Sequence, residues 1–214
     1  MLLQREALRA AMAESDLSKR LVVTPLLDPD QQVGPGSIDL RLGSGFIEVR
    51  RSESHVIDPF NDDVVEAATL QDRYDVPIGE SLSLHPGQFL LGSTFEFIRL
   101  PPCLGGQVLG RSSWGRLGLI VATAVTVQPG FAGCLTLELQ NLGSVPIRLF
   151  PGLRVAQLMV WATEGATQAP YASTAKYTAP LGPESSRIGW EKSEIQRLRA
   201  IGQNLQGEPS GPRT

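Results

Sequence analysis

The residues with the clearest chemical potential lie together in one short segment. Residues 110–118 read Gly-Arg-Ser-Ser-Trp-Gly-Arg-Leu-Gly, so two arginines and two serines stand among three glycines. Guanidinium and hydroxyl groups donate hydrogen bonds to phosphate oxygens, and a glycine-rich turn or helix start presents backbone N–H groups to an anion. The segment could therefore bind a polyanion. A solvated loop between two strands is the alternative, and composition alone favours that alternative.

A single carboxylate, Glu138, is the second candidate for chemistry. It lies in the run Leu-Thr-Leu-Glu-Leu-Gln at 135–140, where apolar and polar residues alternate strictly. In a strand this alternation places the leucines on one face and the polar side chains on the other. A carboxylate in such a position can act as a general base, or it can be an ordinary exposed strand residue.

Metal ligands and common nucleotide motifs are scarce. Cys103 and Cys134 form no CxxC pair, and His55 and His85 belong to no HExxH or HxE arrangement. These patterns disfavour a zinc site and a disulfide framework. Neither GxxxxGK[ST] nor GxGxxG occurs, which disfavours the common nucleotide-binding folds.

Length and composition restrict the class of protein. The chain has 214 residues, 42% of them apolar and 19% charged, and a net charge of −3. These values indicate one domain with appended segments, and they disfavour a strongly basic nucleic-acid binder or a charged disordered chain. No apolar run approaches the roughly 20 residues of a membrane-spanning helix, and the start of the chain does not resemble a signal peptide. We therefore expect a cytoplasmic protein with no nucleic-acid and no membrane partner.

Short strands must position these residues. Residues 1–14 predict one helix, and the runs that follow it are mostly four to seven residues long and separated by turn signals, which is typical of a β-sandwich or β-barrel. The predicted strands are 21–25, 37–42, 46–49, 81–84, 89–91, 95–100, 107–109, 119–127, 134–139, 145–149 and 155–161. The Pro-Gly pairs at 35–36, 86–87, 129–130 and 151–152 each predict a type II turn.

The remaining segments predict insertions and a tail. Residues 61–79 form a polar insertion, within which 64–70 could make a helical turn. The stretch 164–183 is rich in Ala, Thr, Pro and Gly and predicts a loop or tail that is ordered only by docking. Apolar spacings of three and four in 195–205 predict a short amphipathic helix. We divide the chain into a β domain with its N-terminal helix, 1–163, and a C-terminal tail, 164–214.

The order of the motifs resembles the deoxycytidine triphosphate (dCTP) deaminases, relatives of the trimeric dUTP diphosphatases. The resemblance spans roughly residues 35 to 190. The segments that carry it, besides 110–118, are Ser37 to Gly43, Leu119-Ile120-Val121, Thr123-Ala124, Pro129 to Gly133, Leu137-Glu138-Leu139, Pro151-Gly152-Leu153, and Tyr171 with Lys176-Tyr177. It implies a mostly β, dUTPase-like distorted jelly roll or β-clip barrel with an N-terminal helix and a C-terminal tail.

The resemblance also implies which residues bind the triphosphate. Arg111, Ser112 and Ser113 would hold the phosphates, and Tyr171 and Lys176 would add contacts from the tail. Mg²⁺ would enter only as the counterion of the nucleotide. The family forms homotrimers with sites built from neighbouring chains, so we expect the same assembly here.

The resemblance also implies a set of catalytic residues. Glu138 would be the general base that takes a proton from the water attacking C4 of cytosine, and Arg116 and Ser112 would lie beside it. The backbone at Thr123 and Ala124 would contact the cytosine edge. The expected reaction is hydrolysis of dCTP to dUTP and ammonia without zinc.

Two departures keep other functions open. Gln128 stands where the family usually has an aspartate that contacts the deoxyribose, and that aspartate helps to position the attacking water in dUTP diphosphatases. Pro180 lies where a glutamine of the tail is expected. A dUTP diphosphatase is disfavoured by Gln128, and the second alternative is a non-catalytic nucleotide-binding or regulatory protein on the same scaffold.

Overall fold

A computed structural model of the chain describes residues 1–49, 71–122, 126–165, 179–187 and 191–206. The chain divides into two compact units. Met1–Glu48 and Asp72–Glu184 form the first, and Val49–Gln71 and Ser185–Thr214 form the second. In the described part, no helix is both long and apolar enough to span a membrane. The division of the chain at 163/164 stays a prediction.

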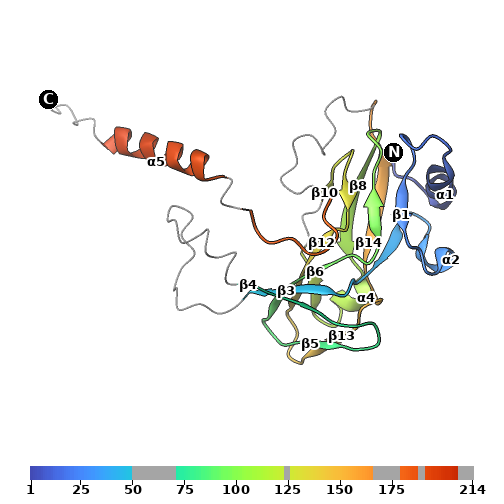
Figure 1. Ribbon diagram of the computed structural model, residues 1–214, viewed down its shortest axis with the longest axis horizontal. Helices are drawn as coiled ribbons and strands as arrows, with labels where there is room; N and C mark the ends of the chain where they lie inside the picture. Colours follow the sequence, from blue (N-terminus) through green and yellow to red (C-terminus); the bar gives the residue numbers. More distant parts are fainter. Residues whose placement is uncertain (50–70, 123–125, 166–178, 188–190, 207–214) are drawn as a thin grey trace. The chain divides into compact units, whose positions relative to one another are not determined.

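Short β-strands make up most of the first unit, and those of the described segments pair in four sheets (Figure 1). The five-stranded sheet has the order β4 (Gln71–Asp75), β3 (Gly45–Val49), β6 (Phe89–Ser93), β12 (Thr136–Asn141), β9 (Leu119–Val121). The four-stranded sheet has the order β10 (Thr126–Val127), β8 (Leu104–Gly110), β14 (Arg154–Ala162), β2 (Ile38–Arg41). The two smaller sheets are β1 (Val22–Thr24), β7 (Phe97–Arg99), β11 (Ala132–Gly133) and β13 (Ile147–Leu149), β5 (Leu82–Leu84).

The helices within the described residues are α1 (Arg5–Ala13), α2 (Pro29–Gln32), α4 (Ser112–Gly115) and α5 (Lys192–Gln206). In Figure 1, α1 lies beside β1, and Leu8 of α1 is fully buried. The carboxylate of Asp28 caps α2 by accepting a hydrogen bond from the backbone N–H of Gln31. Helix α5 belongs to the second unit, and Leu198 and Ile201 on it are exposed.

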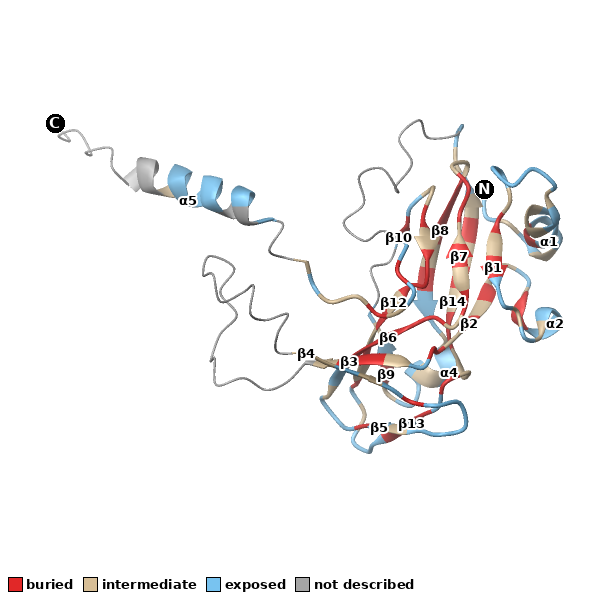
Figure 2. Cartoon of the chain, viewed as in Figure 1, coloured by how far each residue is buried: buried red, intermediate tan, exposed pale blue. Residues whose placement is uncertain are grey.

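The core is apolar and alternates with the polar faces of the strands (Figure 2). Along β12, buried and half-buried residues alternate without exception, and Leu137 and Leu139 have no exposed surface. Burial of each leucine contributes about 1.5–3 kcal/mol, and a shift of one residue would expose both. The leucines therefore fix which face Glu138 occupies.

The structure confirms the mostly β class, the N-terminal helix and a helix in 195–205, and it corrects several details. Residues 71–75, predicted as part of a polar insertion, form the edge strand β4. The single strand predicted at 119–127 is two strands in different sheets, β9 and β10. The helical turn predicted at 64–70 lies outside the described residues.

Three of the four predicted Pro-Gly turns are confirmed. The glycines at 87, 130 and 152 have φ of 74°, 85° and 92°, and in each turn the N–H of the fourth residue donates to the carbonyl of the first. The prediction at 35–36 is wrong because Gly36 lacks a positive φ. That hairpin is instead closed by the N–H of Gly34, which donates to the carbonyl of Ser37.

Candidate functional site

The arginine- and serine-rich segment connects β8 to β9 through the short helix α4. Backbone N–H groups of Trp114 and Gly115 donate to the carbonyl of Arg111, which closes the turn. Gly118 ends the segment at φ 96°. A Cβ atom on Gly118 would lie 2.5 Å from the backbone nitrogen of Gly143. Only glycine fits there, and the chain then enters β9, which pairs with β12.

Arg111 is held by a network inside the chain. Its Nη2 lies 3.3 Å from Oδ2 of Asp39, and its Nη1 donates to the carbonyl of Arg154 at 3.2 Å. The indole Nε1 of Trp114 donates to the same carbonyl at 2.9 Å. The side chain of Arg154 lies 3.2 Å from the same Asp39 oxygen. Two guanidiniums therefore share one carboxylate, which leaves the cluster with a net positive charge.

The other polar groups of the segment face solvent. Ser112, Ser113 and Arg116 are all exposed, and their side chains make no hydrogen bond or ion pair with another described residue. A cation and two hydroxyls are thus available to an external anion. Arg111 contributes the anchored part of this donor set, and Arg116 its exposed cation.

Glu138 lies in the middle of β12, between β6 and β9. It is opposite Leu91 of β6, and its carbonyl accepts a hydrogen bond of 2.8 Å from the N–H of Ala122. Burial raises the pKa of the Glu138 carboxyl above its ordinary value of 4.5. A carboxylate with a raised pKa is a better proton acceptor, which suits a general base.

Within one chain, Glu138 and the polar side chains of the 110–118 segment are not bonded to each other in the described part. No hydrogen bond or ion pair connects Glu138 with Ser112 or Arg116 among the described residues, although α4 packs against β9 and β9 pairs with β12. In the same part of the chain, no cluster of three or more His, Cys, Asp and Glu side chains could hold a metal ion.

The remaining predicted residues are placed only in part. Gln128 is exposed at the Pro-Gly turn after β10, where its carbonyl accepts from the N–H of Phe131. The other four predicted site residues, Thr123, Ala124, Tyr171 and Lys176, lie outside the described residues. Ala122, the last described residue before 123–125, donates its backbone N–H to the carbonyl of Glu138.

The C-terminal tail docks close to Glu138, at partners that the sequence did not predict. The carbonyl of Pro180 accepts from the N–H of Cys134 at 2.6 Å, and the N–H of Glu184 donates to Oγ1 of Thr136 at 3.1 Å. Pro180 and Pro183 are both buried. The prolines of the 179–184 stretch were the available signal, since a rigid, apolar residue is suited to packing on glycine.

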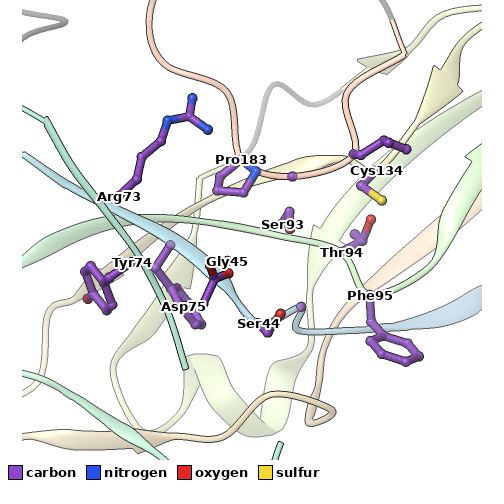
Figure 3. Close-up of a pocket in the computed structure, with 14 residues that line it drawn as sticks. Ser44, Gly45, Arg73, Tyr74, Asp75, Ser93, Thr94, Phe95, Cys134 and Pro183 are labelled. Carbon is purple, nitrogen blue, oxygen red and sulfur yellow. The ribbon is translucent and has the colours of Figure 1, made fainter. Parts of the chain in front are cut away.

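A pocket of about 340 Å³ lies under the docked tail. Residues of β3, β4 and β6 line it together with Cys134 and 181–183, and Figure 3 shows Pro183 and the Cys134 sulfur at its wall. None of the predicted site residues that the structure describes lines this pocket. Burial and the nearby charge of Glu96 raise the pKa of the Cys134 thiol, which suits an inert thiol.

A buried carboxylate was also missed. Glu96 has no exposed surface, and it accepts hydrogen bonds from Nε2 of Gln32 at 2.9 Å and from the backbone N–H of Arg41 at 2.9 Å. Burial raises its pKa above the ordinary 4.5, against the hydrogen bonds that lower it. Glu96 joins α2, β2 and the start of β7.

Comparison with known proteins places this chain in a family. A model of dCTP deaminase-like proteins matches residues 2–163. The chain is 46% identical over 181 residues to a dCTP deaminase of Halorubrum lacusprofundi, covering 83% of this chain and 86% of the relative. The chain belongs to the dCTP deaminase-like family. The family resemblance inferred from the sequence is thereby confirmed.

Other members of the dCTP deaminase-like family differ in the product that their names state. A relative from Dictyoglomus thermophilum, 40% identical over 185 residues (83% of this chain, 94% of the relative), is named dCTP deaminase, dUMP-forming. The solved structure of 2'-deoxycytidine 5'-triphosphate deaminase from Agrobacterium tumefaciens matches with a TM-score of 0.58 at 26% identity. That match covers 76% of this chain and 48% of the Agrobacterium chain.

Proposed function

We propose that the chain is a dCTP deaminase that converts dCTP and water into dUTP and ammonia. The proposal rests on family membership and on one structural observation: a partly buried carboxylate with a raised pKa stands on the polar face of β12. The relatives named dCTP deaminase, among them the one from Halorubrum lacusprofundi, support the same substrate.

Glu138 acts as the general base of this reaction. Its carboxylate takes a proton from water, whose oxygen attacks C4 of cytosine. The proton passes to the ring nitrogen N3, and a second proton transfer through Glu138 lets the 4-amino group leave as ammonia. Arg116 and Ser112 orient the water and stabilise the tetrahedral intermediate. The backbone at Thr123 and Ala124 contacts the cytosine edge.

The triphosphate binds at the segment 110–118. Arg111, Ser112 and Ser113 donate hydrogen bonds to its oxygens, and Tyr171 and Lys176 add contacts from the tail. Mg²⁺ arrives as part of the nucleotide. Asp39, the carboxylate nearest to Arg111 in the described network, already pairs with two arginines, and the phosphate oxygens would supply ligands for the ion.

The proposed assembly is a homotrimer, as the family resemblance implies. Among the described residues, no hydrogen bond or ion pair joins Ser112 or Arg116 to Glu138 inside one chain, and a neighbouring chain could complete each site. Apolar side chains that are exposed near these elements, Leu117 at 61% and Ile120 at 36%, offer surface for such an interface. Light scattering measures the assembly directly, and a monomer that is fully active would contradict it.

We assign dUTP as the product and not dUMP. Formation of dUMP requires, in addition to deamination, the attack of water on phosphorus. Gln128 stands where the family resemblance places the aspartate that positions this water in dUTP diphosphatases, and an amide has no charge and accepts no proton at neutral pH. A protein that binds dCTP without turnover is the remaining alternative. We also propose that the protein acts in the cytoplasm, where a soluble nucleotide substrate would be present.

Replacement of Glu138 by glutamine tests the proposal. Ammonia release from dCTP should fall by about 10²-fold or more, while the Kd for dCTP changes only a few-fold, because the base acts in the transition state. Glu48→Gln is the matched control, since Glu48 is a carboxylate on β3 of the same sheet. Equal turnover of the Glu138→Gln variant and wild type would remove Glu138 from the mechanism.

A further inference from the structure

Asp39 is the charged residue on which the anchored half of the phosphate-binding segment depends. One of its oxygens, Oδ2, lies 3.3 Å from Nη2 of Arg111 and 3.2 Å from Nη1 of Arg154. The side chain of Asp39 is only 15% exposed, compared with 29% for Arg111 and 26% for Arg154. A pair that is this far shielded from water is screened much less than a surface pair.

The network ties together three parts of the first unit. Asp39 belongs to β2, Arg154 to β14, and Arg111 to the turn that leaves β8. The carbonyl of Arg154 accepts from both Nη1 of Arg111 and Nε1 of Trp114. The backbone N–H of Arg111 donates to the carbonyl of Val155 at 3.1 Å. Both ends of Arg111, backbone and guanidinium, are therefore fixed against β14.

Donors remain on Arg111 after these bonds are counted. A guanidinium carries five N–H groups. In the described network, Arg111 gives one to the Arg154 carbonyl and one toward Asp39, so three have no described acceptor. A guanidinium that is fixed in orientation loses less conformational freedom when an anion binds than one that is free to rotate.

We propose that Asp39 is a positioning residue for the polyphosphate of the substrate: it holds the Arg111 guanidinium, through the shared ion pair with Arg154, in the orientation that receives phosphate oxygens. The inference rests on the proposed function, since it takes the substrate to be a nucleoside triphosphate. Asp39 does not touch the substrate and acts through Arg111.

Two effects of removing the Asp39 charge oppose each other. The cluster becomes more positive, which by itself favours each unit of negative charge about 8 Å away by roughly twofold in water, and salt screens part of this gain. The two arginines, however, lose the carboxylate between them and repel each other, so Arg111 leaves its orientation. Loss of a charge-assisted hydrogen bond of this kind reduces affinity by about tenfold or more, so the positioning effect dominates.

The experiment compares Asp39→Asn with Asp30→Asn, in the wild-type and Arg111→Ala backgrounds. Asp30 is a matched control because it also pairs with an arginine, Arg9, at 2.7 Å, but is 90% exposed and far from the segment in sequence. Steady-state kinetics give KM and kcat for dCTP, and calorimetry gives the Kd for inorganic tripolyphosphate. Asp39→Glu serves as a second variant, which keeps the charge and moves it by one methylene.

Asp39→Asn should raise both the KM for dCTP and the Kd for tripolyphosphate about five- to tenfold, with kcat within about threefold of wild type. The KM and Kd of Asp39→Glu should lie between those of Asp39→Asn and wild type, and those of Asp30→Asn should match wild type. In the Arg111→Ala background the effect of Asp39→Asn should disappear, because no guanidinium remains to be positioned.

A purely structural Asp39 would give the same loss in both backgrounds, and this additive result overturns the inference. Equal KM values for Asp39→Asn and Asp30→Asn overturn it as well. Absence of ammonia from wild type would refute the proposed function instead, and tripolyphosphate binding would still decide the role of Asp39.

Discussion

Replacement of Gly133 by alanine should release the C-terminal tail from the strand that carries Glu138. Gly133 has φ 146°, and a Cβ atom there would lie 2.5 Å from Cδ of Pro180. Contacts under 3.0 Å do not occur for real Cβ atoms, and the proline ring cannot rotate away. Either the strand is strained or Pro180 leaves.

The two costs can be compared. If Pro180 stays, overpacking and the unfavourable backbone conformation each cost about 1–3 kcal/mol. If the tail leaves, the bonds Cys134 N–H to Pro180 and Glu184 N–H to Thr136 are lost, at about 0.5–1.5 kcal/mol each, together with the burial of two prolines. The backbone strain is present in both outcomes, but a 2.5 Å contact between a Cβ atom and a rigid proline ring puts the overpacking cost at the upper end of its range. Release is therefore the expected outcome, and the free energy of unfolding should fall by about 2–4 kcal/mol.

Thermal unfolding and limited trypsin digestion measure this change. The Tm of Gly133→Ala should fall by about 5–10 °C, and cleavage after Arg187, just beyond the docked stretch, should accelerate. Gly79→Ala is the matched control, since Gly79 also has a positive φ, 97°, but no atom within 4 Å of the added Cβ. If both variants have the same Tm and the same cleavage rate, the docking contact does not exist as described.

Three further predictions follow from the same contacts. Gly118→Ala would place Cβ 2.5 Å from the nitrogen and 2.7 Å from Cα of Gly143, and it should lower the free energy of unfolding by about 3–5 kcal/mol; a Tm equal to that of wild type would contradict this. Because the folded state raises the pKa of Glu96 above 4.5, folded protein binds the extra proton and the free energy of unfolding should decrease as pH rises from 4.5 through that pKa. Denaturant titrations between pH 4.5 and 7 give the free energy of unfolding at each pH. Its change with pH should be smaller for Glu96→Gln than for wild type, and an unchanged pH dependence would exclude Glu96 as its source. The pKa of Glu138 is raised by burial, so kcat/KM should fall as pH drops through that pKa and protonates the base, and a flat profile between pH 4.5 and 8 would argue against a carboxylate base.

The face that Glu138 occupies could be predicted from sequence, because period-two alternation and leucine burial are local properties. The strand β4 could not, since Gln71 to Asp75 carries no apolar alternation, and it is defined by its place at the edge beside β3. Whether an edge strand forms depends on its pairing partner, which lies elsewhere in the sequence.

The anchoring of Arg111 also escaped prediction from sequence. An arginine in a glycine- and serine-rich loop was expected to bind phosphate, but its link to Asp39 depends on β2 and β8 both pairing with β14. The same applies to Glu96, a lone carboxylate between Phe95 and Phe97 that looks exposed in sequence. Its partners, Gln32 and Arg41, come from α2 and β2.

The most direct test of the account is the simultaneous measurement of ammonia and diphosphate released from dCTP in the presence of Mg²⁺. We predict one equivalent of ammonia for each dCTP consumed, dUTP as the nucleotide product, and no diphosphate. An equal amount of diphosphate would contradict the product assigned through Gln128. Absence of ammonia, with dCTP bound or not, would contradict the central claim that this chain is a deaminase.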